Sequence, residues 1–312
     1  MNKITIIGTG SVGSTIAYTL TVKGLASEIV LIDINQKKAT GEALDIQQGT
    51  PFAHACEIHA GTYEDAEGSD IVIVTSGVAR KPGQSRLDRA QTNVNIFKSI
   101  IPEITKHAPD AIYVIVSNPV DILTYTLCKC SNIPESHIIG SGTMLDTARL
   151  RARLSEFFSI NQKNVHAYVL GEHGDSSFVP WSLANISNIH VDNCCELFPN
   201  HDISAIDHNE VEEFVRKSGG KVIEAKGATF YAVAISVCHI CELLLSGMDT
   251  TMAVSTMMHG EYGIDDVCLS TLNLVGREGV KSKVLLPLTD EEVEKLRHSA
   301  QCLKDIINQI EI

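Results

Sequence analysis

Short apolar runs and longer amphipathic stretches alternate through the first half of the chain. The apolar runs are rich in β-branched residues, as in strands buried on both faces of a sheet, and occur at 3–7, 28–32, 70–75 and 112–117. Stretches with helical periodicity follow them, at 14–22, 37–48, 87–106 and 121–130. This alternation predicts an α/β fold with a doubly wound parallel sheet and helices on both faces.

The second half alternates less regularly and predicts an α+β domain stacked on the first. We expect helices at 143–158, at 209–247 with an interruption near Gly219 and Gly220, and at 290–312, where Thr289 and Glu292 form a capping box. Strand-like runs lie at 165–170, 253–258, 267–275 and 279–286. Because the regular alternation stops near 140–143, we predict one domain over residues 1–142 and a second over 143–312.

A glycine-rich turn, Gly8-Thr9-Gly10-Ser11-Val12-Gly13, joins the first predicted strand to the first helix. Its glycines allow the backbone to approach a pyrophosphate at the helix N-terminus, where free N–H groups favour anions. Asp33 ends the second strand about 20 residues later, where an acid bonds the ribose diol and repels a 2′-phosphate. The pattern favours a Rossmann domain that binds NAD rather than NADP; the alternative is a plain tight turn.

The segment at 77–90 is the most basic part of the chain and follows a predicted strand end. It includes Arg80 and Arg86 around a Pro-Gly pair. A solvated loop is one interpretation. Because the segment leaves the carboxyl end of a strand, we favour a lid that closes over bound cofactor and excludes water.

His173 lies in the sequence VLGEHGD at 169–175, where a buried run ends in a glycine-flanked turn. Its imidazole titrates near neutral pH and suits acid–base chemistry, although a turn histidine bonded to a carbonyl is equally compatible. Asp146 and Arg149 share one face of a predicted helix, whereas Arg151 points elsewhere. The first two suit a histidine partner and a carboxylate binder; an ordinary surface ion pair is the alternative.

Composition excludes several classes of function. The 312 residues are 44% hydrophobic with a net charge of −13, which argues against nucleic acid or an anionic membrane as partner. No run of about 18 apolar residues predicts a membrane span, and no signal peptide is evident, so we expect a cytoplasmic protein with reduced thiols. The spacings of Cys128/Cys130 and Cys238/Cys241 suggest metal pairs, but both lie in apolar helical stretches. We therefore expect packed thiols and no metal.

Five motifs resemble those of the L-lactate/malate dehydrogenase family, over essentially the whole chain: GTGSVG at 8–13, SNPVD at 117–121, SGTMLDTAR at 141–149, GEHGD at 171–175 and KGAT at 226–229. The second half resembles the lactate dehydrogenase branch. The resemblance implies an NAD-dependent enzyme that reduces a 2-oxo acid by hydride transfer. A non-catalytic NAD-binding protein is a remote alternative, because every catalytic position is filled.

The resemblance also implies roles for individual residues. His173 would be the acid and base, Asp146 its partner, and Arg149 the group that binds the substrate carboxylate. Arg86 would polarise the reacting carbonyl, Asn118 would bond it near the nicotinamide, and Thr229 would line the pocket for the substrate's side group. The cofactor positions would be Gly8, Gly10, Val12, Gly13, Asp33, Lys38, Tyr63, Gly77, Ser99, Val116, Asn118 and Ser141.

Arg80 departs from the lactate dehydrogenase pattern, which usually has Gln at this lid position, and resembles malate dehydrogenases. An arginine here would pair with the second carboxylate of oxaloacetate and would be left unpaired by the methyl group of pyruvate. The remaining motifs favour pyruvate. We therefore expect an L-lactate dehydrogenase first, and a malate dehydrogenase or a broader 2-hydroxy acid dehydrogenase second.

Arg151 and His166 match the pair that binds fructose bisphosphate in allosteric bacterial lactate dehydrogenases. Two cationic groups at a subunit interface would hold one phosphate, and their symmetry mates the other. The resemblance thus implies a homotetramer with this effector. The alternative is an arginine that pairs with local acids.

Overall fold

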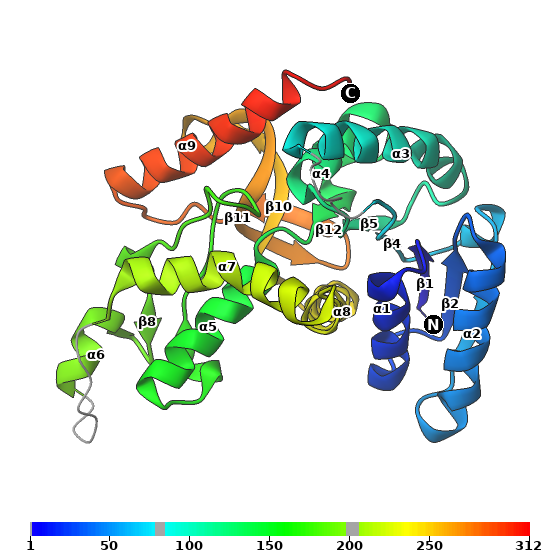
Figure 1. The fold of residues 1–312 in the computed structure, drawn as a ribbon, viewed down its shortest axis with the longest axis horizontal. Helices are drawn as coiled ribbons and strands as arrows, with labels where there is room; N and C mark the ends of the chain where they lie inside the picture. Colours follow the sequence, from blue (N-terminus) through cyan, green and yellow to red (C-terminus); the bar gives the residue numbers. More distant parts are fainter. Residues whose placement is uncertain (1, 79–84, 198–205) are drawn as a thin grey trace.

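The large sheet dominates the computed structural model, which describes residues 2–78, 85–197 and 206–312 (Figure 1). Its strand order is β12-β11-β10-β6-β5-β4-β1-β2-β3. The strands are β1 (Lys3–Ile7), β2 (Glu28–Ile32), β3 (Glu57–Ala60), β4 (Ile71–Val74), β5 (Ile112–Ile115), β6 (Ile138–Gly140), β10 (Thr250–His259), β11 (Asp265–Gly276) and β12 (Gly279–Lys283). A small second sheet contains β7 (Val165–His166), β8 (Asn185–Ile186) and β9 (Ile189–His190).

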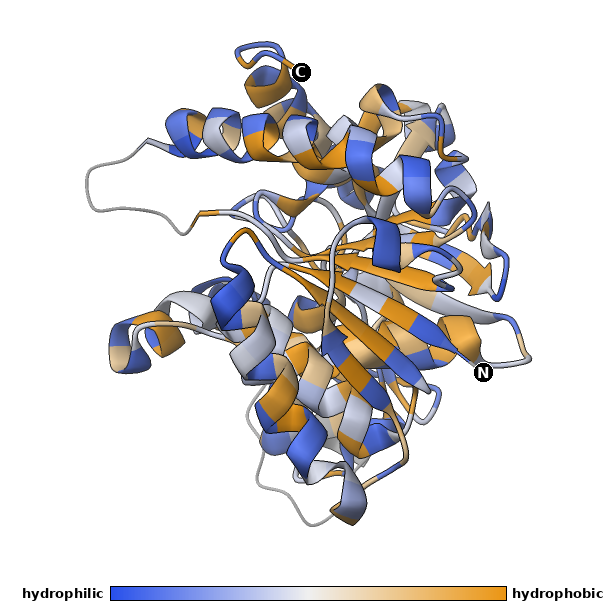
Figure 2. Ribbon diagram, turned by 90° about the vertical axis from the view of Figure 1, so that its right-hand side faces the viewer, coloured by the Kyte–Doolittle hydropathy of each residue, from blue (hydrophilic) through white to orange (hydrophobic). Residues whose placement is uncertain are grey.

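Helices lie on both faces of the large sheet and around the small sheet. They are α1 (Ser11–Lys23), α2 (Gln36–Gly49), α3 (Arg86–His107), α4 (Val120–Cys130), α5 (Met144–Phe158), α6 (Val191–Leu197), α7 (His208–Lys226), α8 (Tyr231–Leu245) and α9 (Asp290–Ile307). One hydrophobic cluster joins the sheet to α3, α4 and α9, and another joins it to α1, α2 and α8. Figure 2 shows the hydrophobic residues concentrated in the strands between these layers. The doubly wound sheet expected from the sequence is confirmed.

The six strands from β6 to β3 are parallel and consist largely of buried apolar residues. Two neighbours in the sheet, β1 and β4, meet at the point where the strand order reverses, and ligands bind such sheets beyond the carboxyl ends of the strands there. The turns that follow β1, β4 and β5 therefore face one crevice.

The second half continues the same sheet. Strand β10 pairs antiparallel with β6 through Ser255 and Gly140, and β11 and β12 follow in antiparallel order. The small sheet packs with α5 and α7 around a separate cluster that includes Leu150, Leu154 and Val215. The α+β character expected of this half is confirmed, and the domain boundary at residue 142 stays a prediction.

Three expected elements differ in the structure. The helix break predicted at Gly219 and Gly220 is wrong: α7 passes through both, and the break falls at Gly227, whose φ of 86° lets its N–H bond to Ile223 O. The strand predicted at 165–170 pairs only over its first two residues, followed by isolated bridges at Leu170 and Gly171. The last helix starts at the predicted capping box but ends at Ile307. In the described part of the chain, no helix could span a membrane.

Candidate active site

The turn that carries His173 is fixed by three separate elements. Gly171 exchanges backbone hydrogen bonds with Ser270 of β11, and the N–H of Glu172 donates to Ser299 Oγ of α9 at 2.7 Å. The N–H of His173 donates to Oδ2 of Asp121 on α4 at 2.8 Å. With its backbone held in this way, His173 keeps its ring partly accessible, with a side-chain exposure of 27%.

The ring of His173 is paired with a buried carboxylate on α5. Its Nδ1 atom lies 2.5 Å from Oδ2 of Asp146, and Nη1 of Arg149 donates to the other oxygen, Oδ1, at 2.8 Å. The Asp146 carboxylate raises the pKa of His173 to about 9, while burial opposes this shift. Burial alone would raise the pKa of Asp146, but His173 and Arg149 together lower it. The arrangement therefore stores a proton on an imidazole whose Nε2 atom is available to react.

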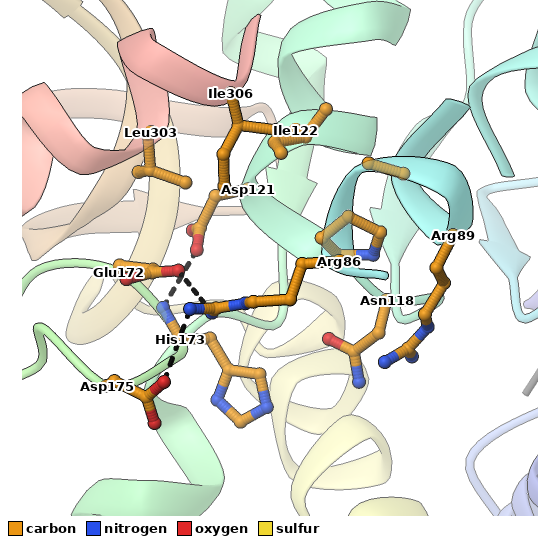
Figure 3. Close-up of a pocket in the computed structure, with 12 residues that line it drawn as sticks. Arg86, Arg89, Asn118, Asp121, Ile122, Glu172, His173, Asp175, Leu303 and Ile306 are labelled. Carbon is orange, nitrogen blue, oxygen red and sulfur yellow. Dashed lines mark hydrogen bonds and ion pairs between the residues drawn. The ribbon is translucent and has the colours of Figure 1, made fainter. Parts of the chain in front are cut away.

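Arg86 begins α3, directly after the N-cap Ser85, and reaches across a cavity of about 310 Å³. Its Nη2 atom lies 3.0 Å from Oε1 of Glu172, and its Nη1 atom lies 3.2 Å from Oδ2 of Asp175. Figure 3 shows the guanidinium held between these carboxylates, with the His173 ring and the Asn118 amide below it. A half-exposed cation beside the histidine can stabilise negative charge on a bound ligand.

Asn118 and Asp121 reach the same cavity from the turn after β5. The peptide bond before Pro119 is cis, and the next residue, Val120, begins α4. Nδ2 of Asn93 donates to the backbone carbonyl of Asn118 at 2.7 Å. The Asn118 side chain is thereby placed in the cavity that also contains His173 and Arg86.

A larger cavity, of about 790 Å³, lies beyond the carboxyl ends of β1, β2 and β4. Seven predicted cofactor residues line it: Gly8, Gly10, Asp33, Lys38, Tyr63, Gly77 and Ser99. The glycine turn is tightly packed, because a Cβ atom at Gly13 would lie 1.9 Å from the Gly8 carbonyl oxygen. At Gly10 a Cβ atom would meet no heavy atom within 4 Å, so the turn has open space there for a pyrophosphate. The other predicted cofactor positions, Val12, Gly13, Val116, Asn118 and Ser141, are not among the residues that line this cavity.

Asp33 closes the glycine turn as well as facing this cavity. Its Oδ2 accepts hydrogen bonds from the N–H and the hydroxyl of Thr9, at 2.6 and 3.0 Å. Burial raises the pKa of Asp33, but the hydrogen bonds from Thr9 and Asn35 outweigh this effect, so the pKa lies below its ordinary value. The carboxylate is therefore charged at neutral pH, which disfavours a 2′-phosphate and favours a free ribose diol.

Arg151 and His166, the predicted effector pair, line a cavity that does not include His173. Nε of Arg151 donates to Ala167 O at 3.1 Å, and Arg151 and His166 line one cavity of about 600 Å³ together with Tyr168. Thr229 is half-buried between α7 and α8. Arg80 lies outside the described residues.

Three carboxylates of the site had no role assigned from the sequence. Glu172 and Asp175 bind Arg86, and Asp121 binds the His173 backbone. All three stand inside motifs that the sequence analysis used, GEHGD and SNPVD. Their position in these motifs was the available signal, but pairing across 52 or more residues follows only from the fold.

Comparisons with known proteins agree over the whole chain. The model "lactate/malate dehydrogenase, NAD binding domain" matches residues 2–140, and "lactate/malate dehydrogenase, alpha/beta C-terminal domain" matches 143–312. An L-lactate dehydrogenase of Acetivibrio thermocellus is 46% identical over 312 residues, which cover 100% of this chain and 98% of the relative. An L-lactate dehydrogenase of Clostridium perfringens is 47% identical, with the same coverage of both chains.

Solved structures show the same likeness. The minor L-lactate dehydrogenase from Enterococcus mundtii, in its ligand-bound form, has a TM-score of 0.95 and 36% identity and covers 100% of this chain and 99% of its own. The L-lactate dehydrogenase from Clostridium thermocellum has a TM-score of 0.88 and 38% identity, with both chains covered completely. The likeness therefore extends to both halves of the fold.

Proposed function

Because the chain belongs to the lactate/malate dehydrogenase family, we propose that it is an L-lactate dehydrogenase, which reduces pyruvate to L-lactate with NADH. It is an NAD-dependent 2-hydroxy acid dehydrogenase with a Rossmann domain. The observation that carries the proposal is the shared carboxylate of Asp146, which bonds the His173 ring with one oxygen and Arg149 with the other. This arrangement places a stored proton beside a carboxylate-binding cation.

His173 supplies the proton of the reaction. The glycine-lined cavity, with Gly8, Gly10 and Asp33, would hold NADH, which would supply the hydride for the carbonyl carbon of the substrate. The Nδ1 atom of His173 faces Asp146, so the proton at Nε2 is the one that passes to the carbonyl oxygen. Asp146 stabilises the imidazolium before this transfer and keeps the ring in one orientation. In the reverse direction, neutral His173 accepts the proton of the hydroxyl group.

Two arginines bind the substrate. Arg149 would hold the carboxylate, with its guanidinium oriented by the contact of Nη1 with Asp146. Arg86 would leave Glu172 and Asp175 to stabilise the negative charge that develops on the carbonyl oxygen, while Asn118 bonds the same oxygen. A contact of this kind typically contributes about 3 kcal/mol or more to transition-state stabilisation.

A comparison of kcat/KM for pyruvate and for oxaloacetate, with saturating NADH, tests the proposal. We expect pyruvate to be preferred, with a methyl-sized group packed near Thr229. Malate dehydrogenase activity is the second candidate, because Arg80 in the lid segment 77–90 would pair with the second carboxylate of oxaloacetate. Oxaloacetate preferred by about a hundredfold would overturn the first assignment.

We also propose that the enzyme is a cytoplasmic homotetramer that binds fructose bisphosphate through Arg151 and His166. Both residues line one cavity, which supports their joint contact with a phosphate group. Sedimentation analysis tests the tetramer. The KM for pyruvate, measured with and without the bisphosphate, tests the effector: we expect a lower KM, and an unchanged value would remove it.

A further inference from the structure

Asp121 is a buried acid whose two carboxylate oxygens have different surroundings. Its side chain lies at the first turn of α4, its residue is only 3% exposed, and it lines the cavity that contains His173. Its Oδ2 atom accepts the backbone N–H of His173 at 2.8 Å. Within the described residues, neither its Oδ1 atom nor the hydroxyl of Ser255, which faces the carboxylate, forms a hydrogen bond of ordinary geometry.

Burial of the Asp121 carboxylate costs desolvation free energy, and its single hydrogen bond to the His173 N–H does not explain why a charged group is used there. One hydrogen bond to a backbone N–H could be made by a neutral side chain, without burial of a charge. Burial raises the pKa of Asp121 to about 6, helped by the nearby charge of Glu172, while Ser255, the His173 N–H and the His173 charge lower it. At neutral pH the group is therefore mostly a carboxylate beside an imidazolium.

We propose that Asp121 is a positioning residue that ties the His173 backbone to the helix behind Asn118 and, through its buried charge, favours the protonated imidazole. The proposal rests on the function proposed above and deepens it. Asn118 and Asp121 are separated by the cis-proline turn that starts α4. The hydrogen bond from His173 to Asp121 therefore fixes the histidine of the second half relative to the amide of the first.

The charges around His173 come from four segments. Asp146 and Arg149 belong to α5, Asp121 to α4, Glu172 and Asp175 to the histidine's own turn, and Arg86 and Arg89, which line the same cavity, to α3. Arg86 is already bound to Glu172 and Asp175, and Arg149 to Asp146. Asp121 has no cationic side chain bound to it among the described residues, so its charge acts on the imidazolium without such a partner. In agreement, Asp121 raises the pKa of His173, after the larger contribution of Asp146.

The substitution Asp121→Asn separates the two parts of this role. Its amide oxygen can still accept the His173 N–H, but the negative charge is gone. We expect the pKa of His173 in the NADH complex to fall by about 0.5 to 1 unit. The rate of reduction of the 2-oxo acid should remain within about threefold of wild type near pH 6. As the pH rises, this rate should begin to fall at a lower pH than in wild type.

Asp121→Ala removes the tether as well. We expect kcat/KM to fall about a hundredfold at every pH, because small displacements of a catalytic group have effects of this size. The signature of the proposed role is nearly full rescue by Asn at pH 6, with activity at pH 9 about two- to fivefold below wild type but still well above that of Asp121→Ala. Asp249→Asn is the matched control, because it removes a distant carboxylate bound to Lys281 and should leave both the profile and kcat/KM unchanged.

Two measurements keep the test independent of turnover. Chemical shifts of the His173 ring, followed against pH by NMR with 15N-labelled histidine, report its pKa directly in wild type and in Asp121→Asn. Even without a folded variant, wild-type shifts should show a second inflection near pH 6, from the titration of Asp121. A His173 pKa unchanged by Asp121→Asn, a single-step wild-type curve, or full activity of Asp121→Ala would each overturn the proposal. A wild-type enzyme that reduces no 2-oxo acid would instead refute the proposed function.

Discussion

Arg86 and Glu172 form an ion pair of 3.0 Å in the open cavity beside His173. The arginine expected to stabilise the substrate oxygen is thus held next to the site by a carboxylate of the histidine's own turn. Glu172 is itself fixed by the hydroxyl of Ser176 at 2.5 Å and, through its backbone, by Ser299. We infer that a bound substrate anion would replace one anionic partner of Arg86 with another, so that the guanidinium is never left unpaired.

Replacement of this arginine tests its role in the transition state. Arg86→Gln keeps a polar side chain but removes the charge that would stabilise the developing oxyanion. We expect kcat to fall by about a hundredfold to a thousandfold, while the Kd for NADH changes little. Single-turnover rates and NADH fluorescence titrations measure the two quantities. A rise in KM with kcat unchanged would instead show that Arg86 binds the ground state and the transition state equally.

His173→Asn separates chemistry from cofactor binding. Asparagine can still bond Asp146 but cannot carry a proton to the substrate. We therefore expect turnover to be abolished while NADH binds nearly as in wild type, because the glycine-lined cavity does not include His173. Turnover within about tenfold of wild type would remove His173 from its role.

The pair formed by Asp146 and His173 predicts opposite pH dependences for the two directions. The pKa of His173, raised to about 9 mainly by Asp146, keeps the imidazole protonated through neutral pH. Reduction, which needs the proton, should therefore persist until the pH approaches 9, whereas oxidation of L-lactate should increase over the same range. In Asp146→Asn both transitions should move to lower pH. Profiles of kcat/KM in both directions check this, and unchanged transitions would contradict it.

The same pair affects stability with a defined sign. The pKa of His173 is higher in the folded protein than its ordinary value of 6.5, so the folded state binds this proton more tightly. Its contribution is complete below about pH 6.5 and is lost as the pH rises toward 9. We expect the free energy of unfolding, measured with urea, to decrease over this range more in wild type than in Asp146→Asn. Equal slopes would exclude the coupling.

The elements that sequence patterns missed are those with weak periodicity. Strand β6 contains only three residues, and the edge strand β3 has the sequence EIHA, without a continuous apolar run. The glycine pair of α7 suggested a break because glycine disfavours helices, yet the helix continues through it. Local propensity was overridden there by the neighbouring turns of the same helix and by its contact with α5.

The sequence predicted those residues of the site that belong to one motif or one helix, but not the contacts between distant segments. The residues His173, Asp146 and Arg149 followed from a turn and from helical spacing, and the structure brings them together. The tether from Asp121 could not be predicted, because it depends on how α4 meets the histidine turn. Likewise, the resting partners of Arg86 follow from the three-dimensional packing of α3 against the GEHGD turn.

The glycine pair in α7 offers a stability test with an internal control. A Cβ atom at Gly220 would meet no heavy atom within 4 Å, and one at Gly219 would lie 3.5 Å from Nη2 of Arg149, an ordinary contact. Alanine at either position should therefore stabilise the protein by about 0.5 to 1 kcal/mol, because it restricts the unfolded chain and favours the helix.

Gly227, eight residues after Gly219, is the matched control because its φ of 86° belongs to the left-handed region. Alanine there should destabilise by about 1 kcal/mol or more, since the same gain in the unfolded state is outweighed by backbone strain. Urea denaturation of the three variants measures the differences. A loss of stability in Gly220→Ala would contradict this prediction, because alanine there meets no neighbour and adopts an ordinary helical conformation.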